Sequence, residues 1–299
     1  MILVTFTGNV FVLYSSIRHN SINLDNMSTV LIRHIALSNL GFTFYIATWT
    51  VTIASRSNVY PDVLCCLFRT WGYVCLITEL LLVAVLSVCK LTWMLRPLRS
   101  LGRSKRLGRR MAAAAWTLSG MWCAGYFLAI QLGGSPEVKF RDATYLCAVD
   151  PGSKVLKRVM GFARTTIVSV SEIVLLVSTV WLLCFVRKTM GRLQKQALVT
   201  TLLISGTYFV SFIPSVLIYR AFREYVLTDS QQNTKEFSVF YSTCQFLTLF
   251  NCAANPVLYC FTIKSYGLFV GKFFKASCDF VKGGKFEIPR ETNSFTFTN

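Results

Sequence analysis

Hydrophobic residues in this chain gather into long runs that short polar segments separate. Most runs have about 20 residues or more, the length that a helix needs to cross the roughly 30 Å hydrocarbon core of a bilayer. Seven runs are found, near residues 1–17, 31–55, 64–93, 111–132, 160–186, 196–220 and 237–262. The pattern predicts an all-α membrane protein, a bundle of seven transmembrane helices that forms one domain over residues 1–276.

Composition and charge agree with a membrane protein. The 299 residues are 54% hydrophobic with a mean hydropathy of +0.51, more apolar side chain than a soluble domain buries. The net charge of +18 would suggest nucleic acid in a soluble protein, but most of the 31 Lys and Arg lie on one side of the seven predicted spans. The positive-inside rule then predicts a cytoplasmic C-terminus, an odd number of spans puts the N-terminus outside, and no nucleic acid partner is expected.

The two ends of the chain carry weaker signals. The start is apolar up to Arg18 without a basic segment before it, so we interpret it as a first helix that is cut short or has almost no outer segment before it. After the last run an apolar stripe predicts an amphipathic membrane-surface helix over about residues 264–276, in contact with lipid, and then a tail over 277–299. Cys278 is a candidate palmitoylation site, with an unmodified thiol as the alternative.

Motifs at matching depths of these runs resemble the rhodopsin-like (class A) G protein-coupled receptors. They are Gly8-Asn9, Leu86-Ser87-Val88-Cys89-Lys90-Leu91 with Arg96-Pro97-Leu98 after it, Trp116, Pro214, and Asn255-Pro256-Val257-Leu258-Tyr259, which matches NPxxY in full. The resemblance implies a plasma-membrane receptor that carries an extracellular ligand signal to a heterotrimeric G protein through helix rearrangement. It also implies a disulfide between Cys65 and Cys147, with Cys66 as the alternative to Cys65.

The chain departs from the family at the inner activation motif. Cys89 replaces the acid and Lys90 the arginine, and Leu91 follows them. Lysine lacks the planar fork of guanidinium, so we expect altered basal activity or weakened coupling. Phe212 stands two residues before Pro214, where the family usually has tryptophan, and keeps an aromatic side chain there.

A carboxylate inside a span is costly, so Glu79 and Glu172 are functional candidates. In the family, a second-helix aspartate anchors a buried cation, and here Asn39 holds that position. The resemblance places Glu79 on the third helix at the same pocket, facing Asn251 and Asn255. Our hypothesis is that Glu79, Asn39, Asn251 and Asn255 bind sodium or a proton. The alternative is a neutral Glu79 that only packs the bundle.

Ligand class is indicated mainly by exclusion. Gly72 stands where amine receptors have aspartate and Leu249 where opsins have the retinal lysine, so neither such an amine nor retinal is expected, and sodium is the one candidate cofactor. Arg69, Arg164 and Arg220 lie near the predicted outer rim, a basic mouth that would attract an anionic ligand. The alternative is solvated loop charge balanced by nearby acids.

Other function classes find less support. The chain has two His, and no metal-ligand pair or nucleophile elbow, so an enzyme is not expected. A seven-helix transporter predicts internal repeats, which the sequence lacks. A non-signalling receptor, acting as a scavenger or dimer partner, stays open because of Cys89 and Lys90. Hydroxyl residues in the tail are candidate phosphorylation sites for arrestin recruitment, namely Thr292, Ser294, Thr296 and Thr298.

Overall fold

The chain folds into long helices that lie side by side. A computed structural model describes residues 1–18, 27–55, 62–95, 105–132, 154–186, 199, 202–211 and 234–262. The helices are α1 (Ile2–Arg18), α2 (Met27–Ser55), α3 (Asp62–Leu95), α4 (Lys105–Leu132), α5 (Lys154–Val186) and α7 (Thr234–Thr262). A further helical segment, Leu202–Ser211, lies between α5 and α7 in the sequence.

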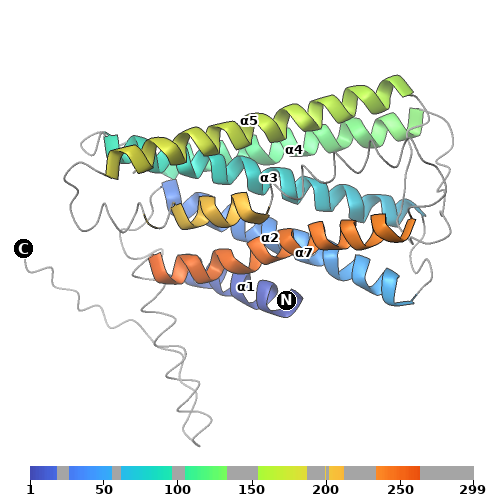
Figure 1. The fold of residues 1–299 in the computed structure, drawn as a ribbon, viewed down its shortest axis with the longest axis horizontal. Helices are drawn as coiled ribbons and strands as arrows, with labels where there is room; N and C mark the ends of the chain where they lie inside the picture. The colour runs from blue at the N-terminus through green and yellow to red at the C-terminus, as the bar shows by residue number, and fades with distance from the viewer. Residues whose placement is uncertain are drawn as a thin grey trace, which may run out of the picture.

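The third helix is the centre of this arrangement. α3 packs against α2, α4 and α5, whereas α1 packs against α2 and α7. Figure 1 shows the helices running along one common direction, with α4 and α5 on one side of α3 and with α1 and α7 on the other. The described parts of the chain therefore form a helical bundle.

One end of the bundle is rich in basic residues. The start of α4 meets the start of α2 there, because a Cβ on Gly108 would lie 3.2 Å from the backbone of Met27. Arg33 of α2 donates to the carbonyl of Ser16 in the last turn of α1, where a cation is favourable to the helix end. We call this the basic end of the bundle; it comprises the end of α1, the start of α2, the end of α3 and the start of α4.

Lengths and composition agree with spanning helices, but the helix ends differ from the apolar runs. Met27–Thr52, Leu67–Thr92 and Thr165–Cys184 are each long and apolar enough to cross a bilayer, and Ile2–Ile17 and Leu202–Ser211 are shorter apolar helices. α4 begins at Lys105 rather than near 111, since Lys and Arg are good helix formers whose long side chains reach the interface. The surface helix at 264–276 and the tail lie outside the described residues and stay predictions.

Polar side chains are buried among apolar ones inside the bundle, and many large apolar side chains are exposed on its outside. Asn9, Asn39, Glu79 and Asn255 are buried in its interior, while large apolar side chains such as Phe6 on α1 and Ile173 on α5 are exposed. This distribution suits a bundle whose outer surface meets lipid and whose polar groups hydrogen bond between helices.

Candidate functional site

The buried carboxylate Glu79 joins α3 to α7. Asn251 Nδ2 donates to Glu79 Oε1 at 3.0 Å, and Asn255 Nδ2 donates to the same oxygen at 3.2 Å. The Cys252 thiol lies 3.7 Å from Oε2. Asn251 and Asn255 are four residues apart, so they share one face of α7 and can reach one acceptor together.

Amides from α1 and α2 complete the cluster. Asn9 Nδ2 donates to the carbonyls of Thr5 at 2.8 Å and Cys252 at 3.1 Å, which leaves Asn9 Oδ1 pointing at Asn39. With its nitrogen toward Asn9, Asn39 donates to that oxygen at 3.2 Å. With its nitrogen toward Glu79, it donates instead to Oε1 at 3.1 Å and Oε2 at 3.2 Å.

The Asn39 amide cannot serve both neighbours at once. If its nitrogen faces Glu79, two amide oxygens face each other; if its nitrogen faces Asn9, its oxygen faces an acceptor-only carboxylate. A proton on Glu79 or a cation among these oxygens removes the conflict. With an ionised Glu79 and no cation, one side of the Asn39 amide therefore always faces a group with which it cannot form a hydrogen bond.

The bundle also buries oxygen atoms that have no hydrogen-bond partner among the described residues. The amide oxygens of Asn251 and Asn255 and the hydroxyls of Thr78 and Ser205 are buried without a hydrogen-bond partner among the described residues. Among those residues, no group of three or more His, Cys, Asp and Glu side chains is arranged so that it could hold a metal ion. A cation at Glu79 would thus meet one carboxylate and the amide groups of neighbouring asparagines, whose oxygens are hard ligands.

The motifs at the basic end share one apolar core. Cys89 and Tyr259 are both buried and belong to the same hydrophobic cluster as Leu86. Lys90 and Leu91 are half-buried beside them. Pro256 faces α1, since a Cβ on Gly8 would lie 3.0 Å from the proline ring. The third-helix and seventh-helix motifs therefore sit in one continuous packing unit.

The described residues include three positions that bear on ligand class, namely Arg69, Gly72 and Leu249. The Arg69 guanidinium lies 5.9 Å from the centre of the Tyr73 ring. Gly72 is covered by α2, because a Cβ there would lie 2.6 Å from the Tyr45 ring. Leu249 is buried in a small cluster with Tyr45 and neighbouring side chains.

Several predicted site residues lie outside the described part of the chain. These are Phe212, Pro214, Arg220, Cys147 and Cys278. Cys65 and Arg164 belong to α3 and α5, but their side chains are outside the description too. The disulfide and the basic mouth therefore stay predictions.

Comparison with known protein families decides what kind of protein this bundle is. The family model for the 7 transmembrane receptor (rhodopsin family) matches residues 8–259, more than half of the chain. The chain belongs to this family. The match confirms the seven-helix bundle and makes the protein a multi-pass plasma-membrane receptor, of a family whose members bind an extracellular ligand and a G protein. A search among curated proteins found no match.

Sequence reasoning did not single out two contributors to the receptor's buried cluster. Asn9 was noted only as part of the Gly8-Asn9 motif, although it links α1 to α7 through the Cys252 carbonyl. Cys252 itself looked like one of many apolar cysteines. Two features of the sequence could have indicated them: Cys252 directly follows Asn251, and Asn9 is a polar amide within an apolar run.

Proposed function

We propose that the receptor transduces an extracellular ligand signal to a heterotrimeric G protein, and that the Glu79 cluster is the joint through which its helices rearrange. The observation that carries this is the pair of bonds from α7 to the α3 carboxylate, at 3.0 and 3.2 Å. α3 leads from Glu79 to Cys89 and Lys90, and α7 leads from Asn255 to Tyr259. A change at the joint therefore acts on both inner motifs.

The cluster also supports a bound proton or sodium ion as part of this proposal. Its amides cannot satisfy an ionised Glu79 and each other together, so a bound proton or cation stabilises the packed state. Binding that differs between two conformations shifts their populations. Proton or sodium binding at Glu79 would therefore set the basal balance between inactive and active receptor.

Partners beyond the G protein rest on the sequence alone. The basic outer residues Arg69, Arg164 and Arg220 favour an anionic extracellular ligand, and a phosphorylated tail would recruit arrestin. Positive charge between the spans supports a cytoplasmic C-terminus.

The first experiment measures ligand-independent second-messenger output in cells that carry equal amounts of receptor at the surface. The variants are Lys90→Arg and Cys89→Asp/Lys90→Arg, which restore the family's residues. We expect output above that of mock-transfected cells and a change in output with each variant, because guanidinium makes the planar contacts that an ammonium group cannot.

Surface-expressed receptor that stays at background in every variant, and also when a panel of anionic compounds is applied, would contradict the proposal. It would favour the second candidate, a non-signalling receptor. The observation behind that candidate is Cys89, whose thiol is hydrogen bonded to Ser28 and cannot form the ion pair of the family's acid.

A further inference from the structure

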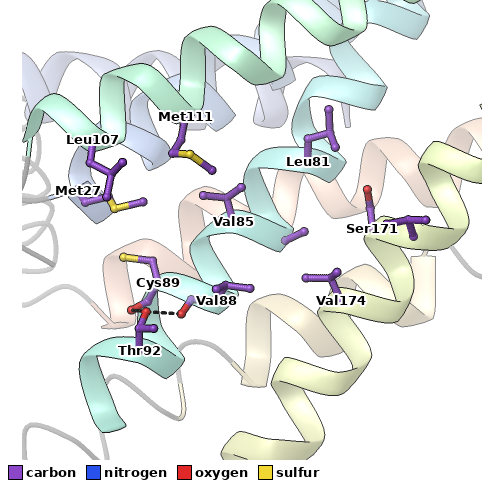
Figure 2. A pocket seen from close by; sticks show the side chains of 12 residues that line it. Met27, Leu81, Val85, Val88, Cys89, Thr92, Leu107, Met111, Ser171 and Val174 are labelled. Atoms are coloured by element: carbon purple, nitrogen blue, oxygen red, sulfur yellow. Dashed lines mark hydrogen bonds between the residues drawn. The ribbon is translucent and has the colours of Figure 1, made fainter. Parts of the chain in front are cut away.

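A cavity of about 400 Å³ opens between α3, α4 and α5, next to the start of α2. Figure 2 shows Val85 and Val88 of α3, Leu107 and Met111 of α4, and Val174 of α5 around it. The cavity exists because α4 and α5 both pack on α3 but scarcely on each other. Its volume falls within the range of about 300–1,000 Å³ that is usual for small-molecule sites.

The lining of the cavity is almost wholly apolar. The hydroxyl of Thr92 donates to the carbonyls of Val88 at 2.6 Å and Cys89 at 3.1 Å, bonds drawn in Figure 2. The hydroxyl of Ser171 donates to the carbonyl of Ile167 at 2.8 Å. Both lining hydroxyls are satisfied within their own helices, and water needs two or more polar partners, so the fitting occupant is apolar.

The cavity faces the outside of the bundle. Val170, which lines it, is 54% exposed, and Val88 is 40% exposed. In a membrane receptor this surface meets acyl chains rather than water. The occupant that is present at high concentration beside the opening is therefore a lipid chain.

Arginines of α4 lie beside the cavity, and positive charge there favours anionic lipids over neutral ones. Leu107 and Met111 turn one side of α4 toward the cavity, and Arg110 follows Leu107 by three residues, so it lies on the adjoining stripe. Arg106, four residues before Arg110, shares that stripe, and both arginines are exposed. Arg109 is exposed as well but falls on the opposite side of the helix.

We propose that an anionic phospholipid binds here, with one acyl chain in the cavity and its headgroup held by Arg106 and Arg110. Basic residues near the headgroups attract anionic lipid with about 1 kcal/mol each. Cys89 lines the same cavity and directly precedes Lys90, so the bound chain touches the inner activation motif. The lipid site rests on the membrane location of the receptor and not on its coupling to a G protein.

Photo-crosslinking of the full-length receptor tests this site. The receptor is reconstituted in phosphatidylcholine vesicles that contain a phosphatidylserine probe with a diazirine on one acyl chain, and the crosslinked residues are mapped by mass spectrometry. We expect labels to concentrate on the cavity stretches of α3 and α5, residues 81–92 and 170–174. A phosphatidylcholine probe should label them several times less.

Matched variants separate a built site from general contact with lipid. Val170→Phe fills the opening and should cut labelling of the cavity severalfold, whereas Val177→Phe, at an equally exposed valine of α5 outside the cavity, should not. Arg106→Gln and Arg110→Gln should each lower the preference for phosphatidylserine by about fivefold, and Arg109→Gln should leave it intact. Labels spread evenly over α1 and α5, or equal effects of the two valine variants, would overturn the proposal.

Discussion

Individual buried side chains hold helices of this receptor together at fixed points. Glu79 accepts from two amides of α7, and Asn9 donates to the Cys252 carbonyl from α1. Each of these bonds lies in the interior, where an unmade hydrogen bond has no water to replace it. Changes at these residues should therefore affect both stability and the response to ions.

Replacing Glu79 with Gln keeps the side chain's size and removes its charge. We expect the purified parent receptor to unfold at a higher temperature in sodium chloride than in choline chloride of equal ionic strength, since an ion that binds only the folded state stabilises it. Glu79→Gln should abolish that difference, whereas Glu172→Gln, at the other carboxylate that the sequence predicts inside a span, should retain it. A parent receptor that responds to pH but not to sodium would indicate a proton; indifference to both would leave Glu79 a packing residue.

Asn9→Ala removes the bond to the Cys252 carbonyl between α1 and α7. The expected loss is about 1–3 kcal/mol, the range for leaving a buried polar group unsatisfied. Thermal unfolding in detergent measures it. Thr7→Ala is the control on the same helix, because the exposed Thr7 hydroxyl bonds only carbonyls of its own helix, and its effect should stay within about 0.5 kcal/mol. Equal losses in the two variants would contradict a special role of Asn9.

Some of these residues could be found from the sequence and others could not. Glu79 stands out because a carboxylate in an apolar run is rare, and the family register placed Asn39, Asn251 and Asn255 beside it; the structure brings these four together. The competition of Asn9 and Glu79 for the Asn39 amide depends on distances of about 3 Å between three helices. Residue spacing along the chain does not contain that information.

At the scale of helices, close approach depends on small residues at the contacts. Gly72 of α3 lies against the Tyr45 ring of α2, and Gly8 of α1 lies against the Pro256 ring of α7. The seven runs were predicted from their apolar length, but these contacts were not, since Gly72 was considered only as a position at the ligand mouth. The apolar runs also did not give the exact helix ends, because helices such as α4 continue through basic residues beyond the apolar run.

Gly72→Ala should therefore separate α2 from α3. The new Cβ would lie 2.6 Å from the Tyr45 ring, and relieving such overpacking typically costs about 1–3 kcal/mol. The expected result is a lower unfolding temperature and less receptor at the cell surface. Gly120→Ala is the control, because nothing lies within 4 Å of a Cβ there, and alanine favours a helix by about 1 kcal/mol. A destabilising Gly120→Ala would show that helical glycines matter here for another reason.

At the scale of the whole molecule, basic residues mark one end of the bundle. Arg18, Arg33, Lys90 and the α4 residues Lys105 to Arg110 all lie toward that end, which also holds Cys89 and Tyr259. The proposed G protein surface is the same end. The orientation of the bundle in the membrane therefore decides both on which side the basic residues lie and on which side a G protein would bind.

That orientation can be tested with an epitope tag at each terminus. Because Lys and Arg between spans are retained on the cytoplasmic side, antibody should reach the N-terminal tag on intact cells and the C-terminal tag only after permeabilisation. Permeabilised cells serve as the control that both tags can be recognised. A C-terminal tag that stains intact cells would place Lys90 and the basic end outside, where no G protein is present, and would refute the proposed signalling while leaving the seven-helix fold untouched.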